Sequence, residues 1–192
     1  MRESAMLWTR RRWLRAALSS VVVSPLASAW AQAPPDADAQ GAKEFPWLEL
    51  TNTHTGEVGK ATFRDANGYI DDALKQFQRV LRDHRSNEEH EMDPALFDQL
   101  SDLAIAAKKE PRYEIISGYR SPASNSMLRS KSTGVSERSL HMQGRATDVR
   151  LKGFSCAELR DLAIAARRGG VGYYEKSNFV HIDTGRVRTW VG

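Results

Sequence analysis

The chain has 192 residues, a length that accommodates one domain with a sizeable core and an additional segment. Its formal net charge is +4, but residues 1–31 contain five arginines and one acidic residue, so the rest of the chain is formally neutral. The charge therefore gives no indication of nucleic-acid binding. Cys156 is the only cysteine, which excludes an intramolecular disulfide.

Residues 1–31 have the three parts of an export signal. Arginines at positions 10–12 precede an apolar stretch over residues 16–26, and Ala29-Trp30-Ala31 offers a small-residue cleavage site. The apolar stretch is too short to remain as a membrane anchor. The consecutive arginines favour the twin-arginine export machinery, and an Arg-rich Sec signal is the alternative. We expect the precursor to lose this signal and the mature protein to be periplasmic, without a membrane anchor.

The mature chain is predicted to begin with a flexible lead-in. Residues 32–45 are rich in Ala, Pro, Asp and Gly, a composition typical of linkers, and one domain is expected over residues 46–192. Apolar and polar residues alternate over residues 47–51, which predicts a strand, and residues 59–64 could return as the second strand of a hairpin.

Two helices are predicted next. Residues 69–84 have apolar side chains at the spacing of one helical face. Asp93-Pro94 combines a preferred N-cap with a proline at the first helical position, so a second helix should extend from there to Ala107. Cys156 lies at the start of a later helical pattern and is interpreted as a small buried residue.

Short strands and turns dominate after Pro111. The remaining predicted strands are 113–117, 146–151, 171–174 and 179–183, and the remaining predicted helices are 123–131 and 157–168. Helices that precede a group of short strands predict an α+β domain, in which the N-terminal helices pack on a mostly antiparallel sheet.

Three side chains in this second half form a candidate metal-binding set. His141 and Asp148 flank Gly144, which permits a sharp turn between them, and His181 follows in a predicted strand. Two histidines and one carboxylate suit a catalytic zinc ion, which keeps a further position open for water. Spacing alone also agrees with ordinary core or surface histidines. His181-x-Asp183 resembles the start of an iron site, but no distal histidine follows it.

The surrounding residues carry a family resemblance. The sequence Ser139-x-His141-x-x-Gly144-x-Ala146-x-Asp148, preceded by Ser117-Gly118-Tyr119-Arg120-Ser121, resembles the D-Ala-D-Ala carboxypeptidase (LAS-type) family of zinc metallopeptidases. Residues 52–57, 170–174 and 179–186 are most similar to its murein endopeptidase K branch, and the hedgehog zinc domain is a more distant relative. The resemblance covers about residues 47–190 and implies a hedgehog/DD-peptidase-like fold.

The resemblance also implies roles for single residues. His141, Asp148 and His181 match the ligands of one Zn²⁺ ion per chain. Arg120 matches an arginine that reaches toward a substrate carbonyl or carboxylate, and a structural ion pair is its alternative role. Ser139 matches a residue that lines the site, although its hydroxyl could equally stabilise a turn.

The general base is not determined by the sequence, because Asn178 and Phe179 stand where the carboxypeptidases of the family have an acid or a histidine. Asp183 follows His181 by two residues and so should share its strand face, where it could act as the base or orient a ligand histidine. Glu175 occurs in a Tyr-Tyr-Glu context similar to that of hedgehog domains, and an exposed turn residue is its alternative.

The function implied by the resemblance is zinc-dependent hydrolysis of peptidoglycan. A murein endopeptidase would cut amide bonds between cross-linked stem peptides during remodelling of the cell wall. Two alternatives remain open at this stage: a D,D- or L,D-carboxypeptidase acting on the same peptides, and a non-catalytic domain that contains zinc and binds peptidoglycan.

Overall fold

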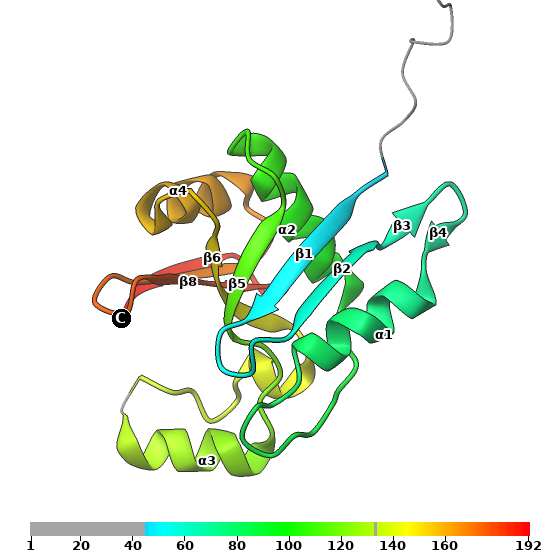
Figure 1. Ribbon diagram of the computed structural model, residues 1–192. Coiled ribbons are helices and arrows are strands. Elements are labelled where there is room, and N and C mark those ends of the chain that lie inside the picture. Colours follow the sequence, from blue (N-terminus) through cyan, green and yellow to red (C-terminus); the bar gives the residue numbers. More distant parts are fainter. Residues whose placement is uncertain (1–44, 133) are drawn as a thin grey trace, which may run out of the picture. The chain divides into compact units, whose positions relative to one another are not determined.

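A seven-stranded mixed sheet organises the part of the chain that the computed structural model describes, residues 45–132 and 134–192 (Figure 1). The predicted export signal and the lead-in up to residue 44 lie outside the described residues. In spatial order the strands are β2 (Val58–Thr62), β1 (Trp47–Asn52), β5 (Arg112–Ser117), β6 (Ala146–Leu151), β8 (Phe179–Asp183), β7 (Gly170–Tyr174) and β9 (Arg188–Val191).

Most neighbouring strands of this sheet are antiparallel. The pairs β1–β5 and β7–β9 are parallel, and the other four are antiparallel. A separate two-stranded hairpin joins β3 (Arg64–Asp65) to β4 (Gly68–Tyr69). The predicted α+β fold with a mostly antiparallel sheet is therefore confirmed.

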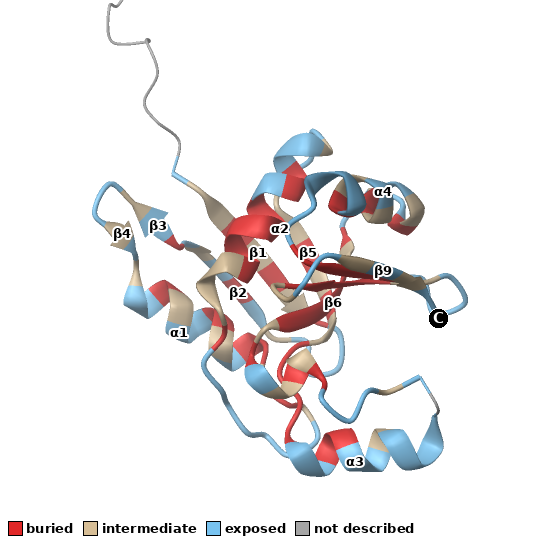
Figure 2. Ribbon diagram, turned by 180° about the vertical axis from the view of Figure 1, so that it is seen from behind, coloured by how far each residue is buried: buried red, intermediate tan, exposed pale blue. Residues whose placement is uncertain are grey.

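Three helices cover one face of the sheet: α1 (Asp71–Val80), α2 (Pro94–Ala106) and α4 (Cys156–Ala166). Alternate strand residues point toward them and form the core, as the period of two in a strand requires. Tyr113 illustrates the packing, because its ring is buried and its hydroxyl donates a hydrogen bond of 2.7 Å to the Leu100 carbonyl oxygen of α2. Figure 2 shows the buried residues in the central strands and along α2. The opposite face carries polar side chains, such as those of Glu49 and Glu114, together with the aromatic side chains of Phe179 and Trp190.

The helix starts follow the sequence prediction more closely than the helix ends. Asp93 caps α2 by accepting a hydrogen bond from the Ala95 amide at 3.0 Å, and Pro94 is the first helical residue. Cys156 is buried at the start of α4, as expected. By contrast, α1 ends at Val80, before the predicted end at residue 84, and strand β9 was not predicted. No described helix combines the length and apolarity that crossing a membrane requires.

The early end of α1 has a structural reason. The segment that follows α1 forms hydrogen bonds with the turn that precedes α3 (Pro122–Lys131). The Leu81 carbonyl oxygen accepts a hydrogen bond from the Tyr119 amide at 2.7 Å, and the buried carboxylate of Asp83 accepts one from the Ser121 amide at 2.9 Å. Arg120 lies between Tyr119 and Ser121 in the chain, so Asp83 helps to fix the backbone that carries Arg120.

We expect Asp83→Asn to lower the free energy of unfolding by about 1–3 kcal/mol at neutral pH, because buried donors lose a charged acceptor. Burial alone would raise the pKa of Asp83, but hydrogen bonds from Ser124, Arg85 and Ser121 outweigh it and hold the pKa well below its usual range. The carboxylate therefore stabilises the fold at neutral pH, and its contribution declines as the pH falls below about 4.

Urea unfolding at several pH values measures this difference. The exposed Asp161 on α4 provides the control, since Asp161→Asn removes only a surface ion pair with Arg160. Equal stability of Asp83→Asn and the wild-type protein at pH 7 would contradict the anchoring role.

Candidate metal centre and active-site pocket

The first candidate ligand, His141, lies in a short 3₁₀ helix, η2 (Leu140–Gln143). This helix ends at Gly144, which has a left-handed backbone with φ of 65°. A side chain at this position would collide with the Glu91 carbonyl oxygen. The sharp turn expected at Gly144 is therefore present, and it leads directly into β6, which carries Asp148.

The other two candidate ligands form a cross-strand pair. Asp148 on β6 lies directly opposite His181 on β8, and both side chains project from the sheet face that α1, α2 and α4 leave uncovered. The potential ligand atoms of His141, Asp148 and His181 all lie within 4.8 Å of one another. All three side chains are buried, with exposed fractions of 3%, 6% and 8%.

Hydrogen bonds define which ring nitrogens are free to bind a metal. His141 Nδ1 lies 2.7 Å from the Gly118 carbonyl oxygen, which only accepts, so this nitrogen carries the proton. His181 Nε2 lies 3.1 Å from Asp183 Oδ2 and, by the same reasoning, donates to it. In the neutral rings, His141 Nε2 and His181 Nδ1 are then unprotonated.

These unprotonated nitrogens face each other and a carboxylate. His141 Nε2 lies 3.2 Å from His181 Nδ1, and Asp148 Oδ1 lies 3.3 Å from the first nitrogen and 2.9 Å from the second. Three buried acceptors that share one point need a proton or a metal ion among them, because acceptors without donors are unfavourable away from water. A metal ion satisfies all three at once, so the residues fit the metal that the sequence predicts.

Electrostatics favour the ligand forms of His141 and Asp148. Burial lowers the pKa of His141 and keeps its ring neutral, although Asp148 opposes the shift. Burial alone would raise the pKa of Asp148, but the two imidazole rings outweigh it and hold the pKa well below its usual range. Burial also lowers the pKa of His181, yet hydrogen bonds with Asp148 and Asp183 raise it overall, so a metal would compete with a proton there.

Asp183 lies behind His181 and is completely buried. Both of its oxygens are occupied: Oδ1 accepts from the Gly170 and Gly185 amides at 2.9 and 2.8 Å, and Oδ2 accepts from Arg188 Nη2 at 2.7 Å as well as from His181. Of the two roles that the sequence left open, this geometry favours the one in which Asp183 orients His181.

Glu175, the other candidate base, is exposed in the turn between β7 and β8 and is not among the residues that line the pocket described below. Its position agrees with the alternative that the sequence analysis gave, an exposed turn residue. A role for it as the base has no support from the geometry.

Arg120 is nine-tenths buried and lies beside the candidate ligands. Its Nη2 is 3.8 Å from Asp148 Oδ2, its contacts with Asn125 and Ser117 are 3.3 and 3.4 Å long, and its Nε has no hydrogen-bond partner within the described residues. Burial lowers the pKa of Arg120, whereas Asp148 opposes the shift. These long contacts leave the guanidinium able to bind an oxygen of a bound molecule.

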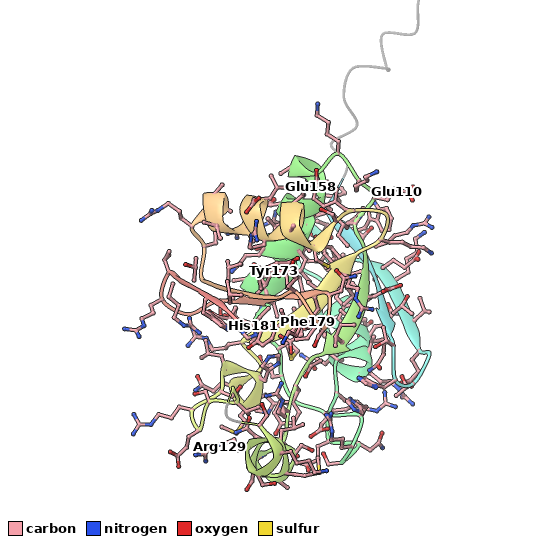
Figure 3. The ribbon with its side chains drawn as sticks, turned by 90° about the vertical axis from the view of Figure 1, so that its left-hand side faces the viewer. Glu110, Arg129, Glu158, Tyr173, Phe179 and His181 are labelled. Carbon is pink, nitrogen blue, oxygen red and sulfur yellow. The ribbon has the colours of Figure 1, made fainter. Side chains whose placement is uncertain are left out.

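A pocket of about 400 Å³ opens over the three candidate ligands. Ser139 lines it, and because its side chain makes no capping bond to η2, the structure provides no support for a turn-stabilising role. In Figure 3, His181 and Phe179 lie on the side of the strands away from α4, whereas Tyr173 lies toward α4. The other side chains that line the pocket come from the loop before η2, from the first residue of η2 and from the last three strands: Val135, Ser136, Arg138, Leu140, Tyr174, Phe179, Arg188 and Trp190.

Comparison with known proteins places this site in a family. The family model described as peptidoglycan L,D-endopeptidase MepK, of the M15 peptidases, matches residues 40–190. The chain belongs to the MepK family of peptidases. The MepK protein of Escherichia coli K12 is 46% identical over 143 residues, which cover 74% of this chain and 79% of that protein. A probable MepK of Haemophilus influenzae is 40% identical over 146 residues, covering 76% and 78%.

Membership in the MepK family confirms the resemblance drawn from the motifs. The matched residues include the three candidate ligands, Arg120 and Asp183. No solved structure gives a significant match to the chain. That the three candidate ligands bind a metal stays a prediction, which the geometry above supports.

One wall of the pocket was not predicted from the sequence. Trp190 lies across β7 at Gly172, its partner in the parallel β7–β9 pair, where a side chain would overlap the indole ring. A side chain at Gly170 would likewise overlap Asp183 and Arg188. The two glycines, two residues apart in one strand, were a signal in the sequence that large side chains cross this strand.

The role of Asp183 can be tested with Asp183→Asn. We expect the affinity for metal to fall about 10–100-fold, as is typical when a group that orients a ligand histidine is removed. Competition with a chromophoric chelator measures the affinity. Asp93→Asn is a suitable control, because Asp93 is also a hydrogen-bonded carboxylate but lies outside the pocket lining. Unchanged metal affinity together with lost activity would instead indicate that Asp183 acts on the attacking water.

Proposed function

We propose that this chain is an exported, zinc-dependent peptidoglycan endopeptidase. The observation that carries the proposal is the convergence of three buried proton acceptors, from His141, Asp148 and His181, at the base of a pocket in a member of the MepK family. The relatives are named as peptidoglycan L,D-endopeptidases, and we propose the same reaction here: hydrolysis of amide bonds in cross-linked stem peptides during cell-wall remodelling.

The donor set supports zinc as the metal. Two imidazole nitrogens and one carboxylate oxygen form a typical catalytic zinc site with a further position open. When bound, zinc lowers the pKa of a coordinated water and polarises a carbonyl group. The same donors also suit Fe(II), which elemental analysis of the purified protein distinguishes.

The charge of the pocket supports an anionic peptide as the substrate. Three guanidinium groups, those of Arg120, Arg138 and Arg188, line it, and Asp148 is the one carboxylate among the lining residues. Asp148 is assigned to the candidate metal and Arg188 is paired with Asp183. Arg120 and Arg138 therefore remain available to bind a substrate. Stem peptides carry free carboxylates, and a guanidinium binds a carboxylate through two parallel donors.

The protein side chains have separate roles in this proposal. Arg120 binds an oxygen of the substrate close to Asp148, and its burial strengthens that interaction. Asp183 holds the proton on His181 Nε2, so that Nδ1 faces the metal position. The Gly118 carbonyl oxygen holds the proton on His141 Nδ1, so that Nε2 of this ring faces the metal position. Ser139 borders the pocket and is proposed to contact the peptide.

The location of the substrate agrees with the export signal proposed for residues 1–31. Peptidoglycan lies outside the cytoplasmic membrane, so a peptidase that acts on it must be exported. We propose that the twin-arginine machinery carries the precursor and that the mature protein acts in the periplasm without a membrane anchor.

We expect protein purified from the periplasm to release peptides from isolated sacculi, and a chelator or His181→Ala to abolish the release. Mass spectrometry of the products identifies the bond: separated stem peptides indicate an endopeptidase, whereas loss of terminal alanine alone would indicate a carboxypeptidase. His54→Ala serves as the control, because His54 lies outside the pocket lining. Binding to sacculi with no product would leave only the non-catalytic alternative.

A further inference from the structure

The pocket contains a phenol that the roles assigned so far do not use. Tyr174 lines it together with His181 and Arg120. With Asp148 and the two histidines assigned to the metal, and Asp183 enclosed behind His181, Tyr174 is the remaining titratable side chain other than arginine among the lining residues that the structure describes.

The sheet register places Tyr174 on the metal-facing side. Asp148, His181, Gly172 and Trp190 are opposite one another across β6, β8, β7 and β9, so they form one row on one face. Tyr174 follows Gly172 by two residues in β7 and therefore projects from the same face as His181.

Two aromatic contacts fix the Tyr174 ring. Phe179, its partner on β8, stacks on it with ring centroids 4.5 Å apart and an interplanar angle of 17°. Trp190 Nε1 donates a hydrogen bond of 3.2 Å to the Tyr174 hydroxyl. The Trp190 ring also lies 5.0 Å from that of His181, so it connects the phenol to the candidate metal centre.

The Trp190 bond sets the direction of the phenol proton. An indole N–H only donates, so the Tyr174 oxygen is the acceptor in that bond and its own proton is directed elsewhere. A neutral donor held rigidly beside a polarised carbonyl stabilises the negative charge that develops on the carbonyl oxygen. Tyr174 has no carboxylate partner in the described residues, so its proton is available to a bound carbonyl oxygen, alongside the substrate contact proposed for Arg120.

We propose that Tyr174 is a catalytic residue that donates a hydrogen bond to the oxygen of the scissile carbonyl, and that Trp190 is the positioning residue that directs it. The inference rests on the proposed function. As the water oxygen bonds to the carbonyl carbon, the π electrons move onto the carbonyl oxygen, which Tyr174 stabilises without giving up its proton. When the carbon–nitrogen bond breaks, those electrons re-form the carbonyl, one proton of the water has moved to the leaving nitrogen, and the products are a carboxylic acid and an amine.

The decisive variant is Tyr174→Phe, which removes only the hydroxyl. We expect kcat on a cross-linked muropeptide to fall about 10²-fold, the typical effect of losing one such donor, with KM and metal content unchanged. Tyr173→Phe is the matched control: the same change one residue away, on the opposite face, where the ring packs under Arg160 of α4 at 4.8 Å. This control should keep full activity.

A binding measurement separates catalysis from folding. A peptide in which a phosphinate replaces the scissile amide resembles the tetrahedral state, so Tyr174→Phe should weaken its binding while leaving product binding unchanged. Trp190→Phe should lower kcat less than Tyr174→Phe does, and it should have no further effect in the Tyr174→Phe background. An additional loss in that background would indicate a merely structural role for Trp190.

The outcomes distinguish this inference from the proposed function. An active wild-type protein whose Tyr174→Phe variant is equally active, or has lost its metal, overturns the role of Tyr174 alone. A Tyr173→Phe variant that loses as much activity as Tyr174→Phe also overturns the role of Tyr174. A wild-type protein that hydrolyses no peptidoglycan overturns the proposed function and this assignment together.

Discussion

The site depends on one cross-strand pair, Asp148 opposite His181 in the middle of the sheet. Their contact, 2.9 Å between Asp148 Oδ1 and His181 Nδ1, places a carboxylate and an imidazole nitrogen side by side in a buried environment. Antiparallel pairing fixes the two Cα positions, so the spacing of these ligand atoms is set by the backbone rather than by flexible loops. His141 completes the group from outside the sheet, and the fold must therefore hold one short segment firmly against β6.

Several parts of the fold hold that segment. Gly144 allows η2 to turn back into β6, the Gly118 carbonyl oxygen orients the His141 ring, and the segment after α1 anchors the turn that contains Gly118. The helices on the far face support the sheet and leave the site face uncovered. A second set of contacts runs behind His181, where Arg188 and two backbone amides enclose Asp183. The two ligand histidines are thus oriented by different means, one by a backbone carbonyl and the other by an ion-paired carboxylate.

The sequence was informative where a local signal has one physical meaning. Asp93-Pro94 marked a helix start, alternating apolar and polar residues marked β1, and the motif around His141 indicated the family. The sequence was less informative about elements whose ends or existence depend on tertiary contacts. The end of α1 depends on hydrogen bonds from residues about forty positions later, Tyr119 and Ser121. Strand β9 has only four residues, too few for a clear pattern, and it is defined by its pairing with β7. Strand parity placed Asp183 on the site face, but parity does not show that Gly170, Gly185 and Arg188 would enclose it.

The enclosure of Asp183 changes where the chemistry of the pocket must come from. A carboxylate whose oxygens accept five hydrogen bonds is well suited to hold a neighbouring imidazole and poorly suited to take up and release a proton. The remaining groups that reach the pocket are arginines, hydroxyls and the aromatic wall formed by Tyr174, Phe179 and Trp190. Trp190 can join this wall because Gly172 leaves that part of β7 bare, and Gly170 likewise makes room for Asp183 and Arg188. The glycines of β7 therefore contribute to the site indirectly, by making room for the residues that orient His181 and for those that border the reacting carbonyl.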